Sequence, residues 1–290
     1  MTSLAPLIDS DDHFVRTCRD ALLSGDYRVP LFLGLTNPVS HLERGQRDCY
    51  ARALPAIAKS VGPAARVIDC GYFAGNNIGL ILQALERPKA GIVLTATSDV
   101  RATDVSLRAS LTAEVSRHPQ NAYEAAWDLE VMAAGRTLVC VSGGGFGMLT
   151  PETAFRLLDN ASAALATGDF VMITLEQPRD VALLEAAYLE PATHIINTAL
   201  AKIGRCEGIT ARVFSEANAK LIRLGGIAES SASVTWNGTT CVLDAGTWID
   251  FGAIHITAAS TAAQLHPDFV VEDHWTSGDQ IVSLLLLRKL

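Results

Sequence analysis

The sequence predicts an α/β protein: a doubly wound, mostly parallel sheet with an antiparallel C-terminal hairpin and an inserted α+β segment. Three observations predict this fold class. Apolar strand-like runs alternate with helical patterns between residues 65 and 177. Two further apolar runs flank Thr276-Ser277-Gly278-Asp279, a hairpin turn signal near the C-terminus. Between these regions, residues 180–255 break the alternation.

The alternating region supplies the sheet and its helices in turn. Apolar runs predict the strands, and amphipathic spacing predicts the helices between them. Thr150, Pro151 and Glu152 form a strong helix start, because Thr can cap a helix and Pro suits its first position. The predicted strands cover residues 65–71, 90–99, 136–145 and 169–177, the predicted helices cover 10–24, 41–60, 77–85, 103–117 and 150–166, and residues 121–128 form a short strand or loop.

The inserted segment has a different pattern. Residues 180–203 form one long helical stretch interrupted by Pro191, and residues 210–255 form short strands. A hairpin is predicted over residues 239–257, with its turn at Asp244–Gly246. We therefore expect a core domain over residues 61–180 and 256–290, an inserted lid or substrate subdomain over residues 181–255, and an N-terminal helical segment, residues 1–60, that packs on the lid.

Charge and composition exclude several classes of function. The net charge is −8 and no cluster of Lys and Arg occurs, so we expect neither nucleic-acid nor membrane binding. The six cysteines show no CxxC or Cys/His spacing, so no metal is expected. The N-terminal residues lack a secretory pattern, and the longest apolar run is far short of a membrane span. We expect a cytoplasmic protein with a small-molecule substrate, and its oligomeric state stays open.

Candidate binding residues follow the predicted strands at their carboxyl ends, where open α/β sheets bind ligands. Gly71 follows the first strand, and Asp99 ends the second, where an acidic residue can hold two ribose hydroxyls. Their separation of 28 residues is about that of a glycine turn and its ribose acid. Asp128 follows the next element, where a carboxylate can accept from an adenine amine. Ser142 and Gly143 open a glycine run after the fourth strand, where a ligand can approach the backbone.

Each of these residues alone has an ordinary explanation, as a turn, a cap or a solvated charge. The ordered set is more specific, and it predicts a nucleoside-type cofactor. Nothing in the sequence matches a phosphate-binding P-loop or a complete GxGxxG motif.

In this order the residues resemble the histidine Nα-methyltransferases of ergothioneine biosynthesis, over most of residues 29–290. VIDCG (67–71) is similar to that family's first S-adenosylmethionine (SAM) motif, and TSDV (97–100) is similar to its ribose-binding segment. Trp127-Asp128-Leu129 stands where the family has Gly-Asp-Phe or Gly-Asp-Tyr, and VSGGGFGMLTPE (141–152) is similar to its GSTIGNLTP stretch. The resemblance implies a Rossmann-like SAM-dependent methyltransferase fold, for which the C-terminal hairpin is also typical, and it implies SAM as methyl donor or as the substrate itself.

The departures from the family concern the motif loop and the acceptor site. Phe73 and Asn77 stand in place of the motif's second glycine and a nearby lysine. Met148 stands where the family has an asparagine that holds the acceptor amino acid, and Gly252 and Ile254 stand where a glutamate and a serine grip it. A contact between an ammonium group and a carboxylate is worth about 1.5–3 kcal/mol, so losing several argues against a histidine-type acceptor.

These departures favour chemistry within SAM itself. The hypothesis is cyclisation of its aminobutyrate arm to azetidine-2-carboxylate or a similar amino acid, with release of methylthioadenosine. Tyr72 and Phe73 can face the sulfonium through cation–π attraction, although packing explains them equally well. Tyr188 is the candidate for positioning the amine, and His255 is a weaker candidate base. The predicted substrate pocket also includes Met148, His194 and Asn197.

Two alternatives stay open. One is a methyltransferase with a less polar amine or hydroxyl acceptor, in which Met148 and Ile254 line an apolar pocket. The other is a non-catalytic SAM-binding protein. The altered motif loop supports this last hypothesis, whereas Asp99 and Asp128 speak against it.

Overall fold

The structure, a computed structural model, divides into two units that each contain a sheet. The core unit comprises Ser40–Pro178 and Thr257–Leu290, and the insert unit comprises Arg179–Ile256. The structure describes residues 40–62, 66–70, 78–85, 90–95, 114–119, 122, 126–127, 135–141, 146, 149–203, 205–216, 220–236 and 239–290. The predicted helix over residues 10–24 lies outside these ranges.

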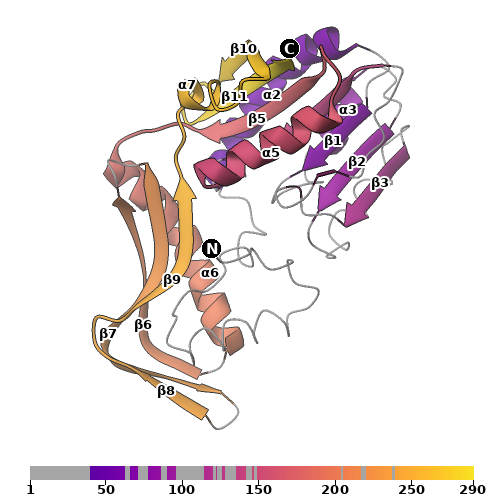
Figure 1. Ribbon diagram of the computed structural model, residues 1–290. Helices are drawn as coiled ribbons and strands as arrows, with labels where there is room; N and C mark the ends of the chain where they lie inside the picture. Colours follow the sequence, from indigo (N-terminus) through magenta and orange to yellow (C-terminus); the bar gives the residue numbers. More distant parts are fainter. Residues whose placement is uncertain are drawn as a thin grey trace. The chain divides into compact units, whose positions relative to one another are not determined.

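The core unit contains a seven-stranded sheet in the order β10-β11-β5-β4-β1-β2-β3 (Figure 1). Its parallel strands pair in register along β3-β2-β1-β4-β5, and β11 runs antiparallel between β5 and β10. The predicted fold class, including the C-terminal hairpin, is therefore confirmed. The strands are β1 (Arg66–Cys70), β2 (Ala90–Thr95), β3 (Glu114–Pro119), β4 (Thr137–Val141), β5 (Phe170–Glu176), β10 (Phe269–Thr276) and β11 (Val282–Lys289).

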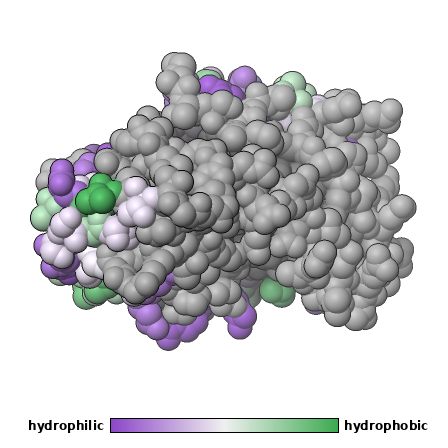
Figure 2. Space-filling model, turned by 90° about the horizontal axis from the view of Figure 1, so that it is seen from below, coloured by the Kyte–Doolittle hydropathy of each residue, from purple (hydrophilic) through white to green (hydrophobic). Residues whose placement is uncertain are grey.

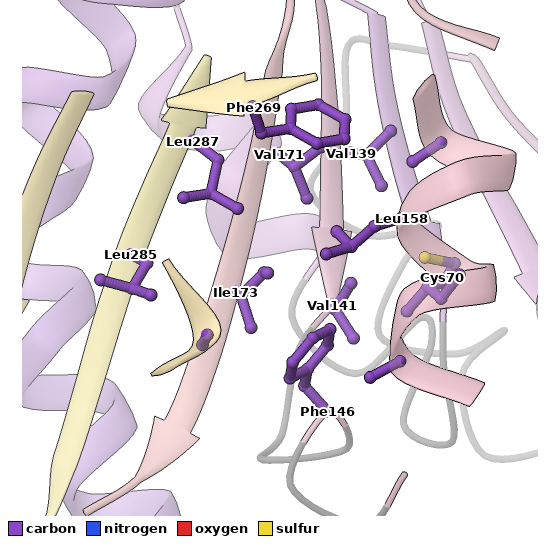
Figure 3. Close-up of a cluster of buried hydrophobic side chains, with 14 of the residues drawn as sticks. Cys70, Val139, Val141, Phe146, Leu158, Val171, Ile173, Phe269, Leu285 and Leu287 are labelled. Carbon is purple, nitrogen blue, oxygen red and sulfur yellow. The ribbon is translucent and has the colours of Figure 1, made fainter. Parts of the chain in front are cut away.

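Helices cover both faces of this sheet. α2 (Ser40–Val61) and α3 (Ile78–Ala84) share one apolar cluster with side chains from one face, and α5 (Pro151–Ala164) and α7 (Ala259–Ala262) share a second cluster with the other face. Figure 3 shows the second cluster, where Leu158 of α5 lies among side chains of β1, β4 and β5. Because burial of each large aliphatic side chain contributes about 1.5–3 kcal/mol, these two layers hold the sheet in place.

The start of α5 follows the sequence prediction. The Thr150 hydroxyl accepts a hydrogen bond from the Thr153 N–H at 3.2 Å, and Pro151 is the first helical residue. Such a cap stabilises a helix by about 1 kcal/mol. This boundary matters for the site because it fixes where the loop between β4 and α5 must end.

Two predictions around the core need correction. Residues 114–117 belong to β3, not to a helix over 103–117, because Glu114–Pro119 pair in parallel with Ala90–Thr95. The pairing of β3 with β2 outweighs the local helical pattern, because tertiary context decides the structure of a segment with weak strand propensity. α2 packs on the core sheet, where Cys49 Sγ donates to the Val282 carbonyl at 3.3 Å. The predicted packing of residues 1–60 on the lid stays a prediction, and residues 40–60 belong to the core unit.

The insert unit combines one helix with a four-stranded antiparallel sheet. α6 (Val181–Ile203) is continuous through Pro191 and packs on β6 and β7. β6 pairs along one edge of the 16-residue β7, and β8 and β9 follow each other along the other edge. The strands are β6 (Arg205–Glu216), β7 (Leu221–Trp236), β8 (Thr239–Leu243) and β9 (Trp248–His255).

The predicted hairpin over residues 239–257 is wrong. β8 and β9 both run antiparallel to β7, so the chain continues in one direction past Asp244–Gly246 and reverses between β7 and β8 instead. Gly246 adopts a positive φ of 84° and donates its N–H to Ala228 O at 2.8 Å, so the turn is a local interruption on the edge of β7. A strand as long as β7 can pair with both segments, and the turn signal alone does not reveal its length.

In the described part of the chain, no helix combines the length and apolar character needed to cross a membrane. The same residues contain no group of three or more His, Cys, Asp or Glu side chains placed to hold a metal ion.

Candidate functional site

The candidate cofactor site lies where the strand order of the core sheet reverses. From β1 the chain proceeds to β2 and β3 on one side, whereas β4 and β5 lie on the other. Cys70 and Val141, the last residues of β1 and β4, are register partners. The loops that follow these strands therefore start side by side at the carboxyl edge of the sheet. This is the switch point at which doubly wound sheets bind their ligands.

The helices that follow these two loops lie on opposite faces. α3, after β1, belongs to the cluster that includes α2, and α5, after β4, belongs to the cluster that includes α7. The chain therefore runs from two neighbouring strand ends to helices on opposite faces of the sheet. Doubly wound sheets bind ligands at such a point.

The predicted cofactor residues themselves lie outside the described ranges. They are Gly71, Tyr72, Phe73, Asn77, Asp99, Asp128, Ser142 and Gly143, and the predicted pocket residue Met148 also lies outside. Their roles stay predictions, but the elements that carry several of them are described. Gly71 follows Cys70 directly, Ser142 follows Val141 directly, and Asp99 comes four residues after the end of β2.

Asp128 follows a well-anchored residue. The indole of Trp127 is buried and donates to the Ala122 carbonyl at 3.1 Å. Asn160 of α5 donates its side-chain amide to the same carbonyl at 3.1 Å. The backbone just before Asp128 is therefore tied to the core, as a cofactor contact at this position requires.

Asp69 is a buried charged residue near the candidate site that the sequence reasoning did not single out. It is fully buried, second from the end of β1, and it is the register partner of Cys140. Burial and the nearby Asp69 carboxylate hold the pKa of the Cys70 and Cys140 thiols well above their usual range, so neither is a nucleophile at neutral pH. The sequence shows it as a charged residue inside the apolar run VIDC, two residues before Gly71.

Gln177 is a second missed residue, at the end of β5. Its N–H donates to Ile281 O at 2.8 Å, which extends the strand pairing by one residue beyond Glu176. Strand alternation places its side chain on the same face as Leu175. Leu175 belongs to the cluster that also holds Phe146 and Leu149, the described residues on either side of Met148 in the sequence. Its amide nitrogen is enclosed and has no hydrogen-bond partner among the described residues. A buried amide donor at the ligand-binding edge suits an oxygen of a bound molecule.

The two predicted catalytic residues lie in the insert unit, Tyr188 on helix α6 and His255 on strand β9. Tyr188 is 1% exposed and shares a buried face of α6 with Leu184 and Ala192, which packs against the sheet. The sheet face buried there carries Ile222, the register partner of Ile254. His255 is the next residue along β9, so its side chain points to the other face. The structure therefore does not bring Tyr188 and His255 together.

His255 has a distinct electrostatic environment. It pairs with Leu221, and alternation places it on the same face as Arg223. Arg223 binds Glu216 Oε1 at 2.8 Å and Asp250 Oδ2 at 2.9 Å. Burial, and then the Arg223 charge, lower the pKa of His255, so the ring is neutral at pH 7. A neutral imidazole ring can accept a proton, as a general base must.

The other two predicted pocket residues lie on α6. Asn197 is exposed, and of His194 only the helical backbone is described. Exposed Asn197 does not share the buried environment of Tyr188.

The strand order, the antiparallel β11 and the switch point between β1 and β4 together define a class, the Rossmann-like SAM-dependent methyltransferases. Within this class, the chain belongs to the family described as histidine-specific, SAM-dependent methyltransferases, which matches residues 47–289. The protein is therefore a SAM-dependent transferase, and SAM is its cofactor. No curated protein matches the chain.

Solved structures show the same fold at low sequence identity. The PH0226 protein from Pyrococcus horikoshii OT3 has a TM-score of 0.51 at 8% identity, with 84% of this chain and 91% of that chain covered. The CcbJ methyltransferase from Streptomyces caelestis follows at a TM-score of 0.49, 7% identity and coverages of 83% and 90%. A SAM-dependent methyltransferase from Clostridium acetobutylicum ATCC 824 has a TM-score of 0.48, 8% identity and coverages of 84% and 92%. The first of these similarities supports the fold alone.

Proposed function

We propose that the protein transfers the methyl group of SAM to a small amine or hydroxyl acceptor other than free histidine. The observation that supports this best is the pairing of β1 with β4 in a chain that belongs to a methyltransferase family. That pairing aligns the loops that carry Gly71 and Ser142, as a cofactor laid across the strand ends requires.

The altered acceptor residues support the exclusion of histidine. Ile254 stands where related sequences grip the acceptor with a serine, and it pairs with Ile222. Both side chains are buried, at 5% and 0% exposure. An apolar pair cannot replace a hydroxyl that binds a charged amino acid, so this position favours a less polar acceptor.

The chain's own residues have separate tasks in this proposal. Asp99 and Asp128 hold the ribose and adenine of SAM, and the loop that starts at Gly71 approaches the methionine arm. Bound SAM supplies an electrophilic methyl group on its sulfonium. Gln177 donates its enclosed amide N–H to an oxygen of the acceptor. Positioning of the acceptor in line with the transferred group then provides most of the rate enhancement.

Cyclisation of SAM, the hypothesis favoured by the sequence, receives less support. Family membership points to methyl transfer. Its basis is the substitutions Phe73 and Asn77 in the motif loop, which lie outside the described ranges, together with the altered acceptor residues.

One incubation separates these reactions. Purified protein is mixed with SAM alone and, in parallel, with SAM plus a panel of amino acids that includes L-histidine, biogenic amines and small alcohols. Methyl transfer predicts S-adenosylhomocysteine only in the presence of an acceptor, with a methylated product detected by mass spectrometry. Methylthioadenosine from SAM alone would establish cyclisation and refute the proposal. Methylation of histidine would refute the acceptor assignment but not the reaction, and bound but unreacted SAM throughout would point to a non-catalytic protein.

A further inference from the structure

Gln46 and Tyr50 of α2 form a buried polar pair in the core unit. Gln46 is 6% exposed and Tyr50 is 1% exposed, and the Gln46 amide donates from Nε2 to the Tyr50 hydroxyl at 2.9 Å. In the view from below, by contrast, the surface of the described residues shows hydrophobic side chains as separate spots among more hydrophilic ones (Figure 2). Burial of an amide costs free energy unless it is hydrogen-bonded, so the position of this pair is a guide to a ligand site.

α2 begins at the carboxyl edge of the core sheet, the edge at which the cofactor loops start. Cys49 donates from Sγ to the carbonyl of Val282, which is the register partner of Glu176, the last residue of β5. Gln46 precedes Cys49 in the helix and lies about 4.5 Å closer to its start. α2 ends shortly before β1 starts at the opposite edge of the sheet. Gln46 therefore lies at the level of the strand ends.

Helical geometry shows in which direction the pair points. Asp48 accepts a hydrogen bond from the turn between β10 and β11 at 2.6 Å, and a Cβ atom added to Gly45 would lie 2.6 Å from Val282 Cγ2 of β11. With about 100° between successive residues, Asp48 lies about 60° before Gly45 around the helix, whereas Gln46 and Tyr50 lie about 100° and about 140° after it. The rotation that leads from β10 to β11 leads next to β5, so the pair faces β5 and the strands beyond it.

The elements in that direction include the helix that follows the cofactor loop. Tyr50 shares its apolar cluster with Ile78, the first residue of α3, and with side chains of β1, β4 and β5. The loop that starts at Gly71 lies outside the described ranges, but the chain after it enters α3 on the face of the sheet that carries the pair. Gln46 thus lies at the strand ends, on the side of the sheet to which the cofactor loop leads.

We propose that the Gln46 amide, held by Tyr50, binds the amino-acid end of SAM. This end carries an ammonium and a carboxylate, and both need hydrogen-bond partners when they leave water. The Gln46 amide has two N–H donors and a carbonyl acceptor, and one N–H is used by Tyr50. The second N–H donates to the SAM carboxylate, and the carbonyl accepts from the ammonium. This role rests on the proposed function, in which SAM lies across the strand ends, but not on the identity of the acceptor.

Isothermal titration calorimetry with S-adenosylhomocysteine and with methylthioadenosine tests this contact. Both ligands contain the adenosine and a thioether, but only S-adenosylhomocysteine has the amino-acid end. Gln46→Leu should raise the dissociation constant of S-adenosylhomocysteine about tenfold and leave that of methylthioadenosine unchanged, because only the former loses hydrogen bonds to charged groups. Gln264→Leu, at an exposed position of the core unit, is the matched control and should change neither constant.

Near-UV circular dichroism of each variant checks that the fold is retained. If Gln46→Leu is misfolded, Tyr50→Phe provides the test, because it keeps the ring and removes the hydroxyl that holds the amide; it should weaken the binding of S-adenosylhomocysteine alone. Equal losses for both ligands in folded protein, or no loss for either, would overturn the role of Gln46. A wild-type protein that binds neither ligand would overturn it together with the placement of SAM. Neither measurement needs turnover, so a lack of methyl transfer would refute the proposed reaction and leave this result intact.

Discussion

The indole of Trp248 lies directly over the backbone of Gly225. A Cβ atom added to Gly225 would lie 2.1 Å from Trp248 Cζ2, far inside contact distance, and Phe214 packs edge-on against the same indole at 5.1 Å between ring centroids. The three residues come from β7, β9 and β6. Gly225 is therefore required by the close approach of a ring, and the contact links three strands of the insert sheet.

Gly225→Ala should destabilise the protein by about 1–3 kcal/mol, because the ring must move out of its packed position. Urea unfolding followed by far-UV circular dichroism measures the loss. The same substitution in a Trp248→Ala background should cost little, since the clashing ring is absent. Gly79→Ala in α3 is the control, because nothing lies within 4 Å of its added Cβ, and it should stabilise by about 0.5–1 kcal/mol. Equal losses from Gly225→Ala with and without Trp248 would contradict the assignment.

Asp99→Ala should weaken SAM binding at least tenfold, because it removes the predicted carboxylate partner of the ribose hydroxyls. Isothermal titration calorimetry with SAM measures the dissociation constant. Asp244→Ala, at an exposed turn of the insert unit, should leave it unchanged. An unaltered affinity in Asp99→Ala would remove the ribose assignment.

Gln177→Leu should raise the KM for the acceptor about tenfold and leave the SAM dissociation constant unchanged, because one hydrogen bond is worth about 1.4 kcal/mol. The comparison of KM with SAM affinity distinguishes an acceptor contact from a general loss of structure. Gln264→Leu, an exposed position in the core unit, should change neither value. A parallel loss of SAM affinity in Gln177→Leu would place the amide in the cofactor site instead.

His255 should titrate below its ordinary pKa of about 6.5, because burial and Arg223 disfavour the imidazolium. Because the pKa of His255 is lower in the folded protein than in the unfolded chain, the unfolded chain takes up the proton at a higher pH than the folded protein does. The stability associated with His255 is thus present above about pH 6.5 and is lost as the pH falls through the folded-state pKa. NMR titration of the His255 ring measures that pKa directly.

The same argument predicts a smaller acid destabilisation in His255→Gln than in the wild type between about pH 7 and 5. Chemical unfolding at both pH values measures the difference. If His255 titrated above 6.5, the expected sign would reverse, and the proposed role of Arg223 would be wrong.

The core could be predicted because its signals are local. The apolar runs of β1, β4 and β5 are buried on both faces, so their sequences alone mark them as strands. Thr150 and Pro151 mark the start of α5 in the same way. β3 could not be predicted, since its pairing with β2 is a tertiary contact between segments that the sequence separates.

Only part of the candidate site could be predicted from the sequence, for related reasons. Spacing can place Gly71 and Asp99 at one edge, but it cannot show that Gln177 has an enclosed donor, because that depends on packing around the end of β5. The opposite orientation of Tyr188 and His255 depends on the register of β7 with β9, which the mistaken hairpin over residues 239–257 concealed. The burial of Asp69 depends on the pairing of β1 with both β2 and β4, which is a tertiary property.

The path of the chain through the two units also bears on how such proteins diversify. The chain leaves the core unit after Pro178 and re-enters it at Thr257, and the seven-strand order is complete without the residues between. The insert is thus one continuous segment between two parts of the core unit. Substitutions such as the one at Ile254 can accumulate there without disturbing the alignment of Cys70 with Val141.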